Sequence, residues 1–255
     1  MNQISPVIIE NLEYRYDKKP VLKDINLDVE QGFVSIIGPN GSGKTTLMKL
    51  TSGLLPLKRG NVLINGTSIQ QLSNLQRARC FTMIQQKQFF PFPFSCLEMV
   101  SLGRYPHRKK INELETEDYQ IVIDAMKATD TLQFRDKLIT EVSGGEQQRV
   151  TLACALAQQP KILFLDEAFS SMDISYQANL IVLLKQFVRE KRLTVISIVH
   201  DLNLAYRYSD RVCILKNGEI KGYGHPHAAM TKDVISDVFD VNVELIERRC
   251  FVIDI

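Results

Sequence analysis

The chain has 255 residues, of which 45% are hydrophobic and 24% charged, with 13 glycines and 9 prolines. These values are typical of soluble globular proteins and exclude the disordered, collagenous and low-complexity classes. Lysine and arginine number 31 against 29 for aspartate and glutamate, a net charge of +2. That balance argues against a nucleic-acid partner, whose phosphates need many cations. The length predicts one or two domains.

No stretch of the sequence predicts a membrane span or a secretion signal. Charged residues interrupt every apolar run before the roughly 18 residues that cross a bilayer, and the first residues lack a basic segment followed by an apolar one. The cysteines are scattered and form no CxxC pair, which is typical of reduced, packed thiols: Cys80, Cys96, Cys154, Cys213 and Cys250. We expect the chain to stay in the cytoplasm.

The first part of the chain predicts strands and then a helix. Residues 7–12 and 21–29 predict strands, the second because Val21, Ile25, Leu27 and Val29 all occupy odd positions. Residues 33–37 (FVSII) are apolar and lie between two glycines, which favours a strand buried on both faces. A helix is expected over residues 44–52, with Gly53 as its stop.

The middle of the chain lacks strand-like runs. Amphipathic stretches at residues 119–128 and 145–157 predict helices instead. We therefore expect one domain with two lobes: an α/β core of about residues 1–89 and 160–255, and a helical subdomain of about residues 90–159 inserted in it.

The last part returns to the α/β pattern. Residues 161–165 and 193–199 predict buried strands, with a long helix over residues 174–189 between them. A helix over residues 202–208 follows. Two apolar runs joined by Asn217-Gly218 then predict a hairpin.

The strongest chemical signal is a phosphate-binding loop. Its residues fit the pattern GxxxxGK[ST] between a predicted strand and a predicted helix: Gly38, Pro39, Asn40, Gly41, Ser42, Gly43, Lys44 and Thr45. Glycines let backbone N–H groups turn toward phosphates, and the helix N-terminus adds its positive dipole end. We expect Lys44 to reach the β- and γ-phosphates and the Thr45 hydroxyl to ligate Mg²⁺.

Two carboxylates follow the strand predicted at residues 161–165. Asp166 is expected at the carboxyl end of that strand, where open α/β sheets bind ligands, and there it can hold Mg²⁺ directly or through water. Glu167 faces differently and can act as the general base for an attacking water. The alternative is a pair of solvated acids. No NKxD motif is present, which argues against a GTPase.

A second candidate anion site lies at Ser143, Gly144 and Gly145. A hydroxyl and accessible backbone N–H groups at a helix start favour an anion. Taken alone, the same residues also fit an N-cap without a ligand. Because the chain already has one phosphate cradle, a second makes sense if two copies pair head to tail and each closes the nucleotide of the other.

Together these motifs resemble those of the ATP-binding subunit of ABC transporters, over essentially the whole chain. Residues 142–146 (VSGGE) resemble the LSGGQ signature, residues 163–167 (LFLDE) the Walker B motif with its catalytic glutamate, and residues 170–173 (SSMD) the D-loop. The resemblance implies a P-loop NTPase of the α/β class. Its RecA-like core would carry an antiparallel β subdomain and an inserted α-helical subdomain.

The resemblance also implies roles for individual residues. Three are implied to be catalytic: Glu167, the switch histidine His200 and the Q-loop glutamine Gln86. The implied Mg²⁺ ligands are Thr45, Gln86 and Asp166. Besides the phosphate loop, the implied nucleotide-binding residues are Tyr16, which would stack on adenine, Thr46, Ser143, Gly144, Gly145, Glu146 and Asp173. Without a family, Tyr16 fits a loop tyrosine between strands and His200 a structural histidine.

Some positions depart from the family pattern. Val142 and Glu146 replace leucine and glutamine in the signature, and Ala168-Phe169 stands where Pro-Thr is usual. An acid is unfavourable beside a γ-phosphate, so Glu146 is expected to face away from it. These departures bear on how fast the chain would hydrolyse ATP more than on whether it is an ATPase.

Three segments are similar to the importer branch that serves iron-siderophore, haem and cobalamin uptake: residues 91–94 (PFPF), 103–107 (GRYPH) and 200–205 (HDLNLA). They fall mainly in the predicted helical lobe and coupling region, so they indicate the type of membrane partner. They say nothing direct about the cargo. The alternative for residues 103–107 is a helix stop followed by a turn.

The sequence thus predicts an ATPase subunit at the cytoplasmic face of the membrane, working with ATP and Mg²⁺ as a head-to-tail homodimer. Its expected partners are a multi-span permease and, indirectly, an extracytoplasmic substrate-binding protein. One alternative is a soluble ABC module acting on ribosomes or DNA, which a single P-loop and the lack of heptads disfavour. Others are an ATP-binding regulator without turnover and an importer subunit for another substrate.

Overall fold

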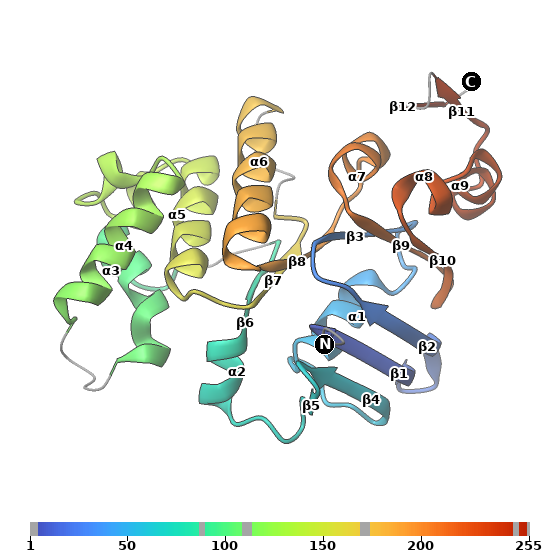
Figure 1. Ribbon diagram of the computed structural model, residues 1–255, viewed down its shortest axis with the longest axis horizontal. Coiled ribbons are helices and arrows are strands. Elements are labelled where there is room, and N and C mark those ends of the chain that lie inside the picture. Colours follow the sequence, from blue (N-terminus) through green and yellow to red (C-terminus); the bar gives the residue numbers. More distant parts are fainter. Residues whose placement is uncertain (1–4, 87–89, 109–113, 169–173, 247–249, 254–255) are drawn as a thin grey trace.

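The computed structural model describes residues 5–86, 90–108, 114–168, 174–246 and 250–253. Its centre is a six-stranded sheet in the order β10-β9-β3-β8-β7-β6 (Figure 1). These strands are β3 (Phe33–Ile37), β6 (Phe81–Ile84), β7 (Ile162–Asp166), β8 (Thr194–Ile198), β9 (Arg211–Lys216) and β10 (Glu219–Gly224). All neighbours are parallel except β9 and β10. The segments that follow β3, β6, β7 and β8 therefore meet at one edge.

The central strands are buried on both faces, as their apolar runs predicted. Every residue of β3, β7 and β8 is buried. Alternate residues join different cores: Phe33 and Ile37 pack on one side of the sheet, and Val34 and Ile36 on the other. Packing on both faces thus fixes the position of the strands from which the loops at this edge of the sheet extend.

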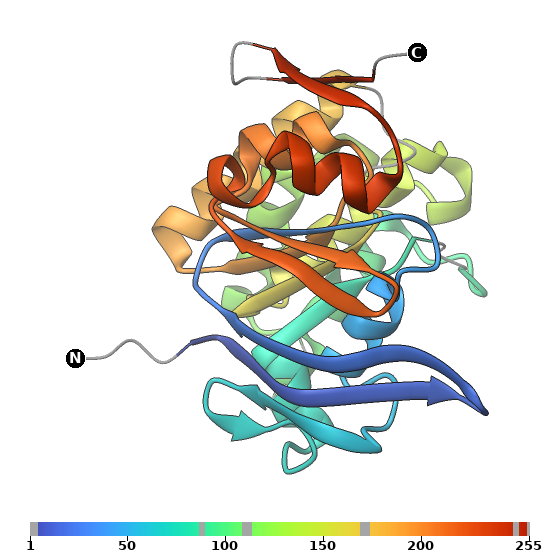
Figure 2. The same cartoon turned by 90° about the vertical axis from the view of Figure 1, so that its right-hand side faces the viewer.

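A four-stranded antiparallel sheet in the order β2-β1-β4-β5 lies beneath the central sheet (Figure 2). Its strands are β1 (Val7–Tyr16), β2 (Lys19–Val29), β4 (Arg59–Ile64) and β5 (Thr67–Ser68). One apolar core joins β1, β2 and β4 to helix α1 (Lys44–Thr51) and to the lower face of the central sheet. This confirms the predicted P-loop fold class with its antiparallel β part.

The predicted alternation of β2 is wrong at its start. Leu22 is buried and Val21 only half-buried, while Ile25, Leu27 and Val29 are buried as expected. The positive φ of 47° at Asp24 marks a bulge, which shifts the inward-facing positions by one residue.

Helices gather at one end of the molecule (Figure 1). They are α3 (Cys96–Ser101), α4 (Thr116–Ala128) and α5 (Gly144–Ala157), which we call the helical lobe, with the 3₁₀ turns η1 (Leu102–His107), η2 (Leu132–Phe134) and η3 (Ile139–Glu141) among them. Among the described residues between Ile84 and Ile162 there is no strand. The division of the chain into a core and an inserted lobe remains a proposal.

The remaining elements surround the central sheet. They are α2 (Asn74–Cys80), α6 (Ile174–Lys191), α7 (Leu202–Tyr208), α8 (Pro226–Ala229), α9 (Lys232–Phe239), β11 (Val243–Ile246) and β12 (Cys250–Ile253). Asn217 and Gly218 have φ of 52° and 80°, as the predicted hairpin turn requires. In the described part of the chain, no helix has both the length and the apolarity to cross a membrane.

Candidate active site

The loop of residues 38–45 joins β3 to α1, and its glycines are required by the backbone. Gly38 has φ of 152°, and a Cβ there would lie 2.0 Å from the Leu215 carbonyl oxygen. Gly43 has φ of 107°, and a Cβ there would lie 2.7 Å from Leu22 Cδ2. Side chains are therefore excluded at both positions, and the backbone N–H groups stay accessible.

The Lys44 ammonium is held inside this loop. Its Nζ donates hydrogen bonds to the carbonyl oxygens of Gly38 at 2.8 Å and Pro39 at 3.0 Å. Lys44 is only 6% exposed, and burial lowers the pKa of its ammonium while Glu167 and Asp166 oppose that shift. A buried cation within a glycine-rich loop at a helix N-terminus suits the phosphates of a nucleotide.

A cavity of about 730 Å³ opens in front of the loop. The sequence-predicted residues that line it are Tyr16, Asn40, Gly41, Gly43, Lys44, Thr45, Thr46 and Glu167. Tyr16 is the last residue of β1 and does not lie in a loop, because β1 runs up to the turn. The residue is 47% exposed beside the cavity. Ser42 Oγ is buried within the loop and has no hydrogen-bond partner in the described structure.

Thr45 and Asp166 are brought together by α1 and β7. The Thr45 hydroxyl donates a hydrogen bond to Asp166 Oδ1 at 3.3 Å. Asp166 is 6% exposed, and burial raises the pKa of its carboxyl although the Thr45 hydrogen bond opposes the shift. A hydroxyl and a buried carboxylate that meet beside the phosphate loop are hard oxygen donors and fit a divalent cation.

Glu167, Gln86 and His200 meet because they follow three neighbouring strands. Gln86 Nε2 donates a hydrogen bond to Glu167 Oε2 at 2.5 Å, and His200 Nε2 lies 2.5 Å from Glu167 Oε1. Glu167 has φ of 53°, an uncommon conformation for a residue with a side chain. This backbone turn sends Glu167 to the cavity, whereas Asp166 still belongs to the strand.

Ser143 is the N-cap of α5 and lies outside the nucleotide cavity of its own chain. Its hydroxyl accepts a hydrogen bond from the Glu146 N–H, and Glu146 Oε2 accepts one from the Ser143 N–H at 2.7 Å. These bonds lower the pKa of the Glu146 carboxyl. The acid at this position therefore completes a capping box at the helix start.

Part of the predicted site lies outside the described residues, and part of the observed cavity lining was not predicted. Asp173 and residues 170–172 of the predicted D-loop, like Phe169, lie outside the described residues. The sequence reasoning missed several cavity-lining residues: Lys19, Pro20, Val21, Lys23 and Asn217. Asn217 approaches because the Gly218 N–H donates to the Ser42 carbonyl oxygen at 3.0 Å, a long-range contact without a local sequence signal.

Residues 22–170 match the ABC transporter family. The chain belongs to the ABC transporter ATP-binding family. The fold class and the resemblance predicted from the motifs are thereby confirmed, as is the prediction of an ATPase coupled to transport at the level of the family. Some relatives in this family have names that state what they transport.

Several curated proteins are similar to this ABC chain. YvrA of Bacillus subtilis, an uncharacterised ATP-binding protein, is 41% identical over 92% of this chain and 53% of its own length. FepC of Escherichia coli, a ferric enterobactin transport protein, is 35% identical over 96% of this chain and 88% of its own. BtuD of Halobacterium salinarum, a cobalamin import protein, is 34% identical over 88% of this chain and 56% of its own length. The chain thus spans about half the length of YvrA and BtuD.

Solved structures share the fold. A dimeric structure of the bacterial ABC transporter cassette MJ0796 is similar with a TM-score of 0.77 and 28% identity, covering 86% of this ABC chain and 98% of that one. A second structure of MJ0796 contains ADP and phosphate, again with a TM-score of 0.77 and 28% identity.

Proposed function

We propose that this ABC chain is the ATP-hydrolysing subunit of an importer for iron chelates or cobalamin-type corrinoids. Hydrolysis is supported by one observation above all: Glu167 stands between Gln86 and His200 at the phosphate-loop cavity. The cargo class is supported by the relatives FepC and BtuD, whose names assign them enterobactin and cobalamin.

In this proposal Glu167 takes a proton from a water that attacks the γ-phosphorus in line. Gln86 and His200 hold both carboxylate oxygens of Glu167, and so fix its orientation. Lys44 leaves the Gly38 and Pro39 carbonyl oxygens to neutralise charge on the β- and γ-phosphates. The unpartnered, buried Ser42 hydroxyl gains a partner when the loop is filled.

The residues proposed to hold Mg²⁺ are Thr45, Asp166 and Gln86. Mg²⁺ keeps several waters and uses few protein ligands beside nucleotide phosphates, so a hydroxyl and one or two further oxygen atoms suffice. In the described ranges, no group of three His, Cys, Asp or Glu residues gathers for a metal. When bound, the ion would neutralise negative charge that develops on the phosphate oxygens.

A head-to-tail pair of copies is supported by Gly144 and Gly145. Both lie in the first turn of α5, neither has a positive φ, and a Cβ on either would meet no atom of a described residue within 4 Å. Nothing in the described part of a single chain therefore requires glycine there, although glycine costs about 0.5–1 kcal/mol in a helix relative to alanine. Close approach by the nucleotide of a second copy supplies the reason.

Docking on a membrane permease is supported by exposed aromatic side chains at residues 92–94 and in η1. Phe92 is 61% exposed and Tyr105 56%, and the rings of Phe92 and Phe94 are tilted against each other with centroids 5.9 Å apart. Apolar surface of this kind marks protein interfaces. We propose that this face binds the cytoplasmic side of the permease, which would place the chain peripherally at the membrane.

Phosphate release from the purified chain, with the permease where activity requires it, tests the proposal. We expect hydrolysis with ATP and Mg²⁺ and none after chelation of Mg²⁺. Glu167→Gln should lose about a hundredfold or more of the rate while still binding ATP, and Glu190→Gln, on the exposed face of α6, should retain it. ATP binding with no release under any of these conditions would favour the regulator instead.

Co-purification and transport test the cargo class. A multi-span membrane protein should co-purify with the tagged chain. In proteoliposomes with a matching binding protein, ferric siderophore or cobalamin should be taken up only when ATP is present on the side of the ABC chain. Uptake of an unrelated solute alone would overturn the cargo class and leave the ATPase proposal intact.

A further inference from the structure

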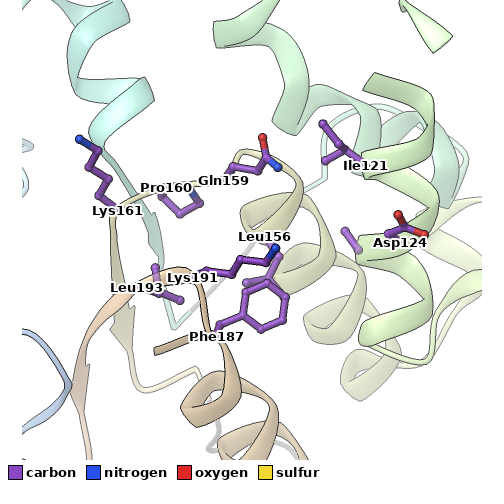
Figure 3. A pocket seen from close by; sticks show the side chains of 10 residues that line it. Ile121, Asp124, Leu156, Gln159, Pro160, Lys161, Phe187, Lys191 and Leu193 are labelled. Carbon is purple, nitrogen blue, oxygen red and sulfur yellow. The ribbon is translucent and has the colours of Figure 1, made fainter. Parts of the chain in front are cut away.

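A second cavity lies between the helical lobe and the central core. It has a volume of about 380 Å³ and is lined from α4, the end of α5 with the segment after it, the end of α6 and Leu193 just before β8 (Figure 3). It shares no lining residue with the nucleotide cavity. Its volume is in the range of sites for small organic molecules.

The walls of this interlobe pocket are mainly apolar. Leu156 and Leu193 are buried, while Ile121 and Phe187 are half-buried and pack against the same core. Figure 3 shows the ring of Phe187 beside Leu156, with Ile121 on the opposite wall. A hydrocarbon chain or ring would find contact on both sides here.

The charges around the pocket are unequal. The Asp124 carboxylate accepts a hydrogen bond from Gln120 Nε2 at 2.9 Å and lies 3.9 Å from Lys127 Nζ. Lys191 and Lys161, in contrast, form no ion pair or side-chain hydrogen bond with any described residue. Figure 3 shows Lys191 reaching along the Phe187 wall, whereas Lys161 points outward at the rim.

The same imbalance continues outside the pocket. A neighbouring hollow shares Lys161 and Lys191 and adds Arg192 and Glu30. Glu30 is already paired with Arg211, through Oε2 at 2.8 Å and Oε1 at 3.3 Å. Asp124 and Glu30, the acids at the two hollows, thus each lie beside a cation of this chain, whereas Lys161 and Lys191 have no acidic partner among the described residues.

We propose that the interlobe pocket binds a small amphipathic carboxylate. Its hydrocarbon part lies between Phe187 and Ile121, and its carboxylate pairs with Lys191 at the mouth. An apolar chamber with one accessible ammonium fits such a molecule, because the walls contact the hydrocarbon part while the Lys191 ammonium attracts a carboxylate and repels a cation. The site is separate from ATP hydrolysis, so it stands or falls independently of the proposed function.

Calorimetric titration of the purified full chain tests the proposal with three probes. Octanoate has both the chain and the charge, octylammonium has the same chain with the opposite charge, and acetate has the charge alone. We expect octanoate to saturate a single site and the other two to show no saturable binding.

Two substitutions locate the site. Lys191→Met should weaken octanoate about tenfold, the loss of one charge-assisted hydrogen bond, and Lys191→Arg should restore it. Ile121→Phe, which fills the chamber, should abolish binding. Lys232→Met on α9 is the matched control and should bind as the wild type does. ATP binding and the melting midpoint are measured for every variant to show that it is folded.

Three results would contradict the proposed carboxylate site. Octanoate that does not saturate, octylammonium that binds as tightly, or octanoate affinity that is unchanged in either Lys191→Met or folded Ile121→Phe would each overturn the proposal. If Ile121→Phe does not fold, Lys191→Met still decides, since its side chain is exposed.

Discussion

His200 Nε2 lies 2.5 Å from Glu167 Oε1, although the two residues are 33 positions apart. The contact exists because β7 and β8 are parallel neighbours that end at the same edge of the sheet. A histidine that holds the carboxylate in one orientation keeps it ready to accept a proton from water.

Removal of this contact should slow hydrolysis without preventing nucleotide binding. His200→Ala leaves the phosphate loop intact, so ATP affinity should remain and phosphate release should fall about a hundredfold. His225→Ala, at an exposed histidine before α8, is the matched control. A His200→Ala rate equal to that of the control would contradict the positioning role.

Lys44→Ala should abolish productive ATP binding. The substitution removes the buried ammonium that donates to the Gly38 and Pro39 carbonyl oxygens, and it leaves the phosphates facing carbonyl groups without a cation. Titration with a fluorescent ATP analogue measures the affinity, and Lys232→Ala serves as the control. Normal ATP turnover by Lys44→Ala would refute the nucleotide site.

Gly145→Ala and Gly103→Ala should have opposite effects on stability. A Cβ at Gly145 would meet no described atom within 4 Å, so alanine should raise the free energy of unfolding by about 0.5–1 kcal/mol. A Cβ at Gly103 would lie 2.2 Å from the Cys154 carbonyl oxygen, so alanine should lower it by about 1–3 kcal/mol.

The activity of Gly145→Ala completes this test. If a second copy brings its nucleotide against α5, the extra methyl group should reduce hydrolysis even though the single chain is more stable. Denaturant unfolding and phosphate release on the same sample measure both quantities. Full activity in a stabilised Gly145→Ala protein would argue against a close approach at this helix start.

Glu146 should make the stability of the chain depend on pH. Its hydrogen bond from the Ser143 N–H places the pKa of its carboxyl in the folded chain below that of the unfolded chain. The stabilisation is therefore complete above the ordinary carboxyl pKa and is lost as the pH falls through the lower, folded value.

Comparison with Glu146→Gln isolates this contribution, since glutamine also completes a capping box. The wild type should be more stable than Glu146→Gln near neutral pH, and the difference should vanish in acid. Glu117→Gln, in the first turn of α4, controls for general acid effects. A difference that stays constant across the acid range would show that ionised Glu146 has no special role.

The local parts of the site follow from the sequence because neighbours in the chain build them. The strand of residues 33–37, its loop and α1 are contiguous, so their glycine and apolar pattern predicts both structure and chemistry. The same holds for β7 and β8, whose five residues each are all buried. Asn217-Gly218 likewise marks its hairpin directly.

The contacts across the sheet could not be predicted from the sequence alone. β6 is only four residues long and lies at the edge of the sheet, so the strand that carries Gln86 toward Glu167 gives a weak signal. The bulge at Asp24 likewise broke a simple alternation. The interlobe pocket depends on how α4, α5 and α6 pack, which no local pattern encodes.

The most direct test of the account is the oligomeric state of Glu167→Gln with ATP and Mg²⁺. If Ser143 of one copy completes the nucleotide site of the other, the variant should bind ATP, fail to hydrolyse it, and elute as a dimer in size-exclusion chromatography with light scattering. With ADP it should elute as a monomer. A Glu167→Gln protein that binds ATP and Mg²⁺ and remains monomeric would contradict the head-to-tail arrangement.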